Sequence, residues 1–405
     1  MRATRADLGL LFAIALVAGF AQFGAVAALN DVARYFGHVS RATTLRDAVG
    51  LSGSEIGVGM GVVRLASLLA MPLSASADRH GRVRVLRRAL LAGLLATAAA
   101  TLSPSYWFFV ACFALARPLL TAVSTLVQVV VVETSTSAQR ISRLIVMAAG
   151  AGVGSGLSAV LHSLIRGPNS FRWLFALALV PVVLVVPLVH RLSEPHAHRA
   201  DELERRLGSV PHAVRARLGI VALVSFATGL ITGPANGFAF VYAEGVLRMA
   251  PHVVALVVVL SGLAGLAGLG LSRWLSHAWG RRATVGFGLI CLGLTSSVAY
   301  AGGRTSFVVG YMLGVAAAGL FAPAASALST EIFERRVRAT AAGWVALAGV
   351  LGATVGLGVF GWLSDVIRST QLTSLRTSAL WTFWPLMPSV LLLLRVPESR
   401  GVEID

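Results

Sequence analysis

The sequence has 405 residues, of which 56% are hydrophobic and only 13% are charged, with a formal net charge of +17 at pH 7. A soluble globular domain carries about 25% charged residues, so an ordinary water-soluble fold is excluded. The positive charge comes from arginines that lie mostly in short loops between apolar segments, where they orient membrane helices, so we expect no nucleic-acid partner.

Apolar segments follow one another along the whole chain, and a bilayer crossing needs roughly 20 such residues. The first segment begins near Leu8 and is too long for the apolar part of a signal peptide, so we expect it to be a membrane helix. In chain order the segments lie near residues 8–30, 55–77, 87–103, 106–132, 141–165, 172–190, 217–243, 252–275, 284–302, 305–330, 339–364 and 377–394. The pattern predicts an all-α membrane protein with twelve transmembrane helices.

A charged connection divides the chain nearly in half. We expect residues 1–190 to form an amino-terminal six-helix bundle, residues 191–216 a cytoplasmic linker, and residues 217–405 a carboxy-terminal six-helix bundle. Most loop arginines lie on the side that the two termini share, so the positive-inside rule predicts cytoplasmic termini. We therefore expect a multi-pass protein of the cell inner membrane that is surrounded by lipid and is a monomer.

An internal repeat relates the two halves. Glu133 and Arg140 follow the fourth segment, and Glu331 and Arg338 follow the tenth, each pair separated by seven residues and offset by 198. The loops after the second and eighth segments share a glycine–arginine step, Gly81–Arg82 and Gly280–Arg281. A constant offset of this kind predicts a duplicated six-helix unit.

These residues resemble the major facilitator superfamily of secondary transporters over essentially the whole chain. The loop Asp78-Arg79-His80-Gly81-Arg82-Val83-Arg84 resembles the most specific signature of that family. Three further motifs resemble the sugar-porter and metabolite-symporter branches: Arg117-Pro118, Glu331-Ile332-Phe333 with Arg336 and Arg338, and Pro397-Glu398-Ser399-Arg400-Gly401. The resemblance implies two pseudo-twofold-related six-helix bundles that carry a solute by alternating access.

The resemblance also implies that the signature cluster latches the cytoplasmic ends of helices 2 and 11 when the carrier faces outward. Gly81 permits a tight connection, and Asp78 can pair with arginines and accept hydrogen bonds from a helix N-terminus. The alternative is a static loop clamp, and in the second half His277 stands where the acid is expected. The expected latch residues are Asp78, Arg79, Gly81, Arg82, Glu133, Arg140, Gly280, Arg281, Glu331 and Arg338.

Two arginines lie in the middle of predicted membrane helices, where a charge costs at least roughly 2.5 kcal/mol. At about 1.5 Å per residue, Arg64 is about 14 Å from Glu55 and about 21 Å from Asp78, too far to reach either interface easily. Arg117 is similarly central. They either face a cavity and bind an anionic or strongly polar substrate, or hold neighbouring helices together. For Arg64 we favour the cavity, and for Arg117 both interpretations stay open.

The seventh segment contains Thr232-Gly233-Pro234-Ala235-Asn236-Gly237, a group of residues that interrupt helical hydrogen bonding. Irregular backbone at membrane depth lines a cavity or is buried in protein, so this segment predicts either a binding site or a packing kink. The amide of Asn236 can both donate to and accept from a substrate. Further expected cavity residues are Gln22, Gln128, Tyr242 and Trp344.

Acidic residues fall at the ends of the predicted helices rather than at their centres. The candidates for proton coupling are therefore Asp31, at the outer end of the first helix, and His162 in the fifth, because imidazole titrates near neutral pH. Each can instead be an ordinary interfacial residue. The sequence carries no phosphate-binding loop, metal-ligand cluster or nucleophile–base spacing, so we expect no enzyme activity, no catalytic residue, no cofactor and no metal.

The leading hypothesis is a secondary active transporter, best described as a symporter, which moves a small polar or anionic metabolite with protons. The first alternative is an efflux carrier for amphipathic drug-like compounds, which requires a more apolar cavity with aromatic walls. The second, from another class, is a membrane sensor that keeps the carrier fold and binds its ligand without moving it.

Overall fold

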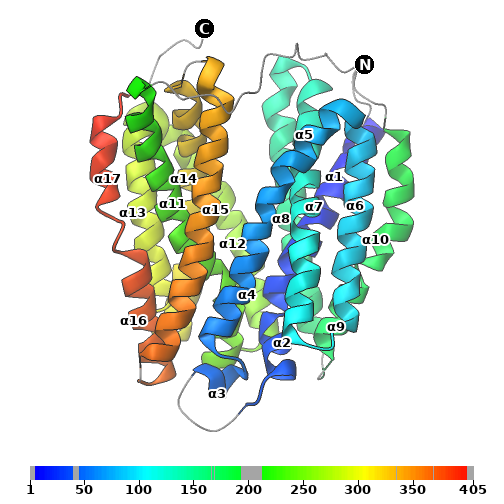
Figure 1. Cartoon of the computed structure of the whole chain (residues 1–405), viewed down its shortest axis with the longest axis vertical. Helices are drawn as coiled ribbons and strands as arrows, with labels where there is room; N and C mark the ends of the chain where they lie inside the picture. The colour runs from blue at the N-terminus through cyan, green and yellow to red at the C-terminus, as the bar shows by residue number, and fades with distance from the viewer. Residues whose placement is uncertain are drawn as a thin grey trace. The chain divides into compact units, whose positions relative to one another are not determined.

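A computed structural model describes residues 5–398 except 40–44, 166, 168, 193–211, 334 and 368. All regular secondary structure in these residues is helical (Figure 1). Eleven of the described helices are long and apolar enough to cross a membrane: Ala6–Ala27, Gly53–Ala77, Arg82–Leu102, Tyr106–Glu133, Ser142–Leu164, Ser170–Arg191, Arg215–Gly237, Pro251–Ala278, Arg281–Ala299, Arg304–Ser329 and Thr340–Val366.

The twelfth segment, expected over residues 377–394, is broken into shorter pieces. Helix α16 (Gln371–Phe383) is followed by α17 (Ser389–Leu392) and the 3₁₀ turn η5 (Leu393–Arg395). Pro385 and Pro388 lie between α16 and α17, and proline interrupts a helix because it lacks a backbone N–H. The predicted all-α architecture of twelve membrane helices is confirmed, with its last helix interrupted.

Contacts between residues divide the chain into two compact units. Unit 1 consists of Met1–Gly37 and Val62–Glu204, and unit 2 of His38–Gly61 and Arg205–Asp405. The linker expected over residues 191–216 lies largely outside the described residues, and the expected bundle boundaries remain a prediction. Helix α4 (Gly53–Ala66) passes from unit 2 into unit 1 along its length.

The same pairs of helices pack together in both units (Figure 1). In unit 1, α1 (Arg5–Ala27) runs along α8 (Ser137–Leu164), and α6 (Arg82–Ala99) packs on α7 (Tyr106–Glu133). In unit 2, α11 (His212–Gly237) runs along α15 (Arg335–Val366), and α13 (Arg281–Ala299) packs on α14 (Arg304–Glu331). Helix α14 also packs on α12 (Pro251–Ala278). These are corresponding helices of the two halves, as a duplicated unit requires.

Glycines allow the closest of these approaches. A β-carbon on Gly154 of α8 would overlap the carbonyl oxygen of Leu16 in α1, and one on Gly352 of α15 would overlap that of Phe226 in α11. In a membrane, helices associate through such close packing because lipid removes the hydrophobic driving force. The core of unit 1 is filled from α1, α6 and α7 by side chains that include Leu11, Leu90 and Val123.

Candidate functional site

Helix α7 carries a stripe of polar side chains through its middle. Its members recur every three or four residues and so share one face of the helix: Arg117, Thr121, Ser124 and Gln128. All four are partly or fully exposed, whereas the residues of the adjoining face are buried in unit 1, namely Ala116, Leu120, Val123 and Val127. Polar groups at membrane depth face water or protein rather than acyl chains, so this stripe marks a polar side of unit 1.

The second membrane arginine, Arg64, precedes a turn that packs on α7. Arg64 is in the last turn of α4, and a 3₁₀ turn, η1 (Ser67–Leu69), follows it before α5 (Ala70–His80) begins. The Arg64 carbonyl accepts a 2.6 Å hydrogen bond from the Oγ of Ser67. The turn η1 packs on α7, and the buried Nε of Arg117 has no hydrogen-bond partner among the described residues.

Gln22 of α1 reaches the same polar stripe. Its Nε2 donates to the Oγ of Ser124 at 3.2 Å and to the carbonyl oxygen of Leu120 at 3.3 Å. Gln22 therefore contacts the stripe that Arg117 belongs to, and the assignment of Arg64, Arg117 and Gln22 to a substrate cavity remains a prediction. Gln128 lies further along the stripe and is exposed.

The two residues predicted for proton coupling are neighbours in unit 1. Asp31, on α2 (Leu29–Phe36), has its Oδ2 3.7 Å from the Nδ1 of His162, which is 3% exposed. The Oγ of Ser170, at the start of α9 (Ser170–Ala176), donates a 2.5 Å hydrogen bond to the same carboxylate oxygen. Sequence reasoning treated Asp31 and His162 separately and missed Ser170, because three distant segments build this cluster.

The irregular backbone of the seventh segment lies slightly later than expected. Helix α11 continues through Pro234 to Gly237, and a π-helix, η4, follows over Val241–Val246. The hydroxyl of Tyr300 donates to the carbonyl oxygens of Pro234 and Ala235 at 3.2 and 3.3 Å. Tyr300, the residue that follows α13, thus contacts α11 at its proline, ahead of the π-helix.

The three cavity residues predicted in the second half are not joined by any described contact. Asn236 donates from Nδ2 to the carbonyl oxygen of Thr232 in its own helix, at 2.9 Å. Tyr242 is buried against Tyr300, with ring centroids 4.7 Å apart. Trp344 is 48% exposed on α15. Their assignment to a substrate cavity remains a prediction.

Unit 2 contains a partly open cavity of about 290 Å³ that sequence reasoning did not find. Residues of α11, α13, α14, α15 and η5 line it, and most of them are apolar. Phe321 supplies an aromatic side chain, and Ser225, Ser326 and Ser329 supply the hydroxyl groups. Such a cavity suits an apolar or amphipathic molecule better than an anion.

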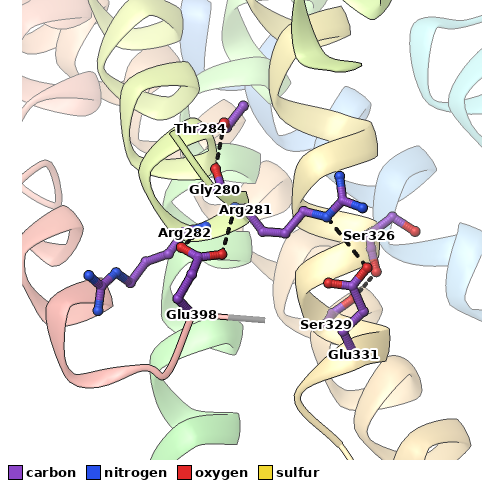
Figure 2. A network of polar contacts seen from close by, with 8 residues as sticks. All are labelled: Gly280, Arg281, Arg282, Thr284, Ser326, Ser329, Glu331 and Glu398. Carbon is purple, nitrogen blue, oxygen red and sulfur yellow. Dashed lines mark hydrogen bonds and ion pairs between the residues drawn. The ribbon is translucent and has the colours of Figure 1, made fainter. Parts of the chain in front are cut away.

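A network of polar contacts surrounds the start of α13 in unit 2 (Figure 2). The carboxylate of Glu398 accepts hydrogen bonds from the backbone N–H groups of Arg281, at 2.7 Å, and Arg282, at 3.2 Å. Gly280 precedes them with a φ of 94°. The Nε of Arg281 lies 3.4 Å from Oε1 of Glu331. In the first half of the repeat Asp78 stands three residues before Gly81, whereas His277 stands three residues before Gly280. In the second half it is Glu398 that places a carboxylate at this connection.

Unit 1 contains the corresponding contacts. Gly81 has a φ of 92° before α6, and Arg82 forms an ion pair with Glu133 at the end of α7. The pairs Arg82–Glu133 and Arg281–Glu331 therefore join equivalent positions within each unit. Two of the other predicted latch residues are described: Arg79 is exposed, and Arg338 donates from Nε to the carbonyl oxygen of Phe333 at 3.3 Å. The side chains of Asp78 and Arg140 lie outside the described residues. The latch itself remains a prediction.

A further contact within unit 2 was missed by sequence reasoning. The carboxylate of Asp365, in the last turn of α15, accepts hydrogen bonds from the backbone N–H groups of Gly53 and Ser54, both at 2.8 Å. These are the first residues of α4, whose terminal N–H groups have no partner within the helix. Asp365 therefore caps α4 from a position more than three hundred residues away in sequence.

Twelve membrane helices, the last of them interrupted, define a multi-pass membrane protein. Residues 11–247, more than half of the chain, match the sequence pattern of the Major Facilitator Superfamily. The chain belongs to the major facilitator superfamily, as its motifs predicted. No curated protein matches the sequence.

Solved structures of transporters are similar over almost the whole chain. The nucleoside transporter NupG gives a TM-score of 0.73 at 13% identity, covering 96% of this chain and 99% of that one. The inward-open xylose transporter XylE from E. coli gives 0.75 at 14% identity, covering 98% of both chains. A bacterial homolog of the human lysosomal transporter Spinster, in an inward-facing and occupied conformation, gives 0.74 at 14% identity, covering 96% of both. At these identities the similarity concerns the fold alone.

Proposed function

We propose that this protein is a secondary active transporter that moves a small polar or anionic metabolite across the inner membrane by alternating access, with both termini in the cytoplasm. The observation that carries the proposal is the polar stripe of α7, where Arg117 has a buried Nε without a partner among the described residues and the turn that follows Arg64 packs on the same helix. Charges inside a membrane protein are retained where they serve a substrate or ion pathway. A guanidinium group binds carboxylate and phosphate groups through parallel hydrogen bonds.

The arrangement of Asp31, His162 and Ser170 supports proton coupling. The Asp31 carboxylate lies beside the buried His162 imidazole, and a carboxylate and an imidazole this close can pass a proton between them. The cluster is built by α2, α8 and α9, separately from the α7 stripe. The proton would therefore bind at its own site within unit 1, so that substrate and proton can be bound at the same time, as symport requires.

Proteoliposomes containing the purified protein test the proposal. We expect radiolabelled anionic metabolites to exchange in counterflow, and an imposed proton gradient to drive their accumulation. Arg64→Ala is expected to abolish this exchange, while Arg87→Ala, on the exposed face of α6, is expected to leave it unchanged. Ligand binding without flux under any gradient would instead favour a sensor that has kept the carrier fold.

The cavity in unit 2 supports a second candidate function, efflux of an amphipathic drug-like compound. Its lining is mostly apolar and includes Phe321. Replacing Ala325, which lines it, by Trp would fill this space. Two results together would favour efflux over metabolite transport. Cells carrying Ala325→Trp would lose drug resistance, and the unchanged protein would transport no anion in proteoliposomes.

A further inference from the structure

The cavity of unit 2 has a buried floor and an exposed mouth. The floor consists of apolar side chains of α11, α13, α14 and η5 that are at most 7% exposed, namely Val221, Val224, Val285, Phe321, Leu328 and Leu393. The mouth is lined by the exposed residues Ala342 and Ala346 of α15 and Ser326 of α14. Because the side chains at the mouth are small, a ligand can reach the floor without displacing a large group.

The lining of the cavity disfavours a charged ligand. No charged residue is among the described residues that line it. Just beyond Ser329, Oε1 of Glu331 lies 3.4 Å from Nε of Arg281, so these two charges offset each other (Figure 2). A charged group that moved from water to apolar walls would lose its hydration without gaining a partner. An uncharged ligand is therefore favoured.

Two serine hydroxyls determine which hydrogen-bonding group fits the cavity. The Oγ of Ser225 donates to the carbonyl oxygen of Val345 at 2.8 Å, and the Oγ of Ser329 donates to that of Ser326 at 2.9 Å. A hydroxyl has one hydrogen and two acceptor lone pairs, so both serines have used their hydrogen and can only accept from a ligand. An ether or ester finds no donor in these two serines, whereas an O–H or N–H group can bond to either oxygen.

We propose that this cavity binds an uncharged aromatic molecule of one or two rings that carries an O–H or N–H donor, as phenols and indoles do. The ring of Phe321 can pair with an aromatic ligand in an offset or edge-to-face arrangement, while the donor bonds to Ser225 or Ser329. A volume of about 290 Å³ is at the lower end of the range for ligand sites, which suits a small ring system. The inference goes beyond the proposed metabolite transport, because it concerns unit 2 alone and names the ligand of the cavity on which the efflux candidate depends.

Thermal unfolding of the full-length protein in neutral detergent tests this ligand chemistry. The probes are indole, 1-methylindole, which lacks the N–H donor, and indole-3-carboxylate, which keeps the donor but is negatively charged. A ligand that binds only the folded protein raises its unfolding temperature. We expect indole to raise the unfolding temperature and the other two probes to raise it clearly less. Each probe enters detergent to the same extent for every variant, so differences between variants report on the cavity.

Variants assign the response to the cavity. Ala325→Trp fills the space and is expected to abolish the response to indole, whereas Ala322→Trp, at an exposed position of the same helix outside the lining, should respond as the wild type. Ser225→Ala with Ser329→Ala removes both acceptors and leaves the space open. This double variant should bind indole on the order of 10-fold more weakly and no longer distinguish it from 1-methylindole. It keeps the test decisive even if Ala325→Trp does not fold. Its control is Ser76→Ala, which removes a similar hydrogen bond within α5.

Any of four results would overturn the inference. The wild type could show no response to indole, an equal response to 1-methylindole, or an equal response to indole-3-carboxylate. The fourth is an indole response that persists in the folded Ala325→Trp protein. These results are separate from those that test the metabolite site of unit 1, because counterflow of an anionic metabolite is measured without indole and can succeed or fail independently.

Discussion

Ser54 donates two hydrogen bonds to one oxygen of Asp365, from its backbone N–H at 2.8 Å and from its Oγ at 2.5 Å. Gly53 donates its N–H to the other oxygen. Beneath this contact, a β-carbon on Gly57 would overlap the carbonyl oxygen of Leu357. The carboxylate of α15 thus completes the N-terminus of α4 where the two backbones touch.

Removing this cap is expected to destabilise the protein. Asp365→Ala leaves the first N–H groups of α4 without their acceptor, which costs about 1 kcal/mol at a helix N-terminus. Asp365→Asn keeps one oxygen acceptor and is expected to fall between Ala and the wild type. The measurement is the unfolding temperature in detergent, and equal values for Asp365→Ala and the wild type would show that water replaces the carboxylate.

Alanine substitutions at two glycines of α15 are expected to change the stability of the protein differently, because different surroundings face the two positions. Gly352→Ala should destabilise the packing of α11 on α15 by about 1 to 3 kcal/mol, because the new methyl group overlaps the Phe226 carbonyl. Gly358, on the same helix, has nothing within 4 Å of the position of a β-carbon. Gly358→Ala should therefore leave unfolding unchanged or stabilise the helix by about 0.4 to 1 kcal/mol. Similar unfolding temperatures for both variants would contradict the close approach.

The glycine before α13 is expected to tolerate substitution poorly for two reasons. Gly280 has a φ of 94°, and a β-carbon there would lie 2.6 Å from the carboxylate of Glu398. Gly302 has a φ of 110° and open space around it, so Gly302→Ala measures the backbone strain alone, about 1 to 3 kcal/mol. Gly280→Ala should destabilise the protein by more than Gly302→Ala does. Adding Glu398→Ala to Gly280→Ala should then have little further effect on stability. If the losses of stability from the two substitutions simply add, the contact between Gly280 and Glu398 is contradicted.

The Asp31–His162 pair is expected to affect coupling more than substrate exchange. Asp31→Asn keeps the acceptor for Ser170 but cannot release a proton, so proton-driven accumulation should be lost while counterflow persists. His162→Asn should weaken accumulation, and His190→Asn, at an exposed position, should not. The measurement is uptake into proteoliposomes with and without an imposed gradient. Normal accumulation by Asp31→Asn would remove the carboxylate from the proton pathway.

Much of the fold could be predicted from the sequence because membrane helices depend on local properties. Apolar runs of sufficient length locate the spans, and the offset between Gly81 and Gly280 reveals the duplicated unit. Both glycines have the positive φ that their place in a tight connection requires. The interruption at Pro385 and Pro388 was missed because the apolar run continues across it, although proline itself signals a break.

The site could be predicted only in part, because its contacts join segments that are far apart. Arg64 and Arg117 were recognisable singly by the cost of a charge in lipid, but the packing of the turn after Arg64 on α7 depends on contacts between distant segments. Glu398 and Asp365 were placed only at helix ends or in a family motif. No local pattern indicates that each would accept backbone hydrogen bonds from a distant helix.

Residues 38–61 precede most of unit 1 in sequence yet pack in unit 2. A polypeptide made only of residues 205–405 would lack the segment whose Gly53 lies against Gly361, and the α15 backbone at that point would lose its neighbour. If the two halves of the chain were translated separately, we would expect them to form the native fold only when the start of α4, from the first fragment, packs on the second fragment. The second unit is thus not encoded by the second half of the gene alone.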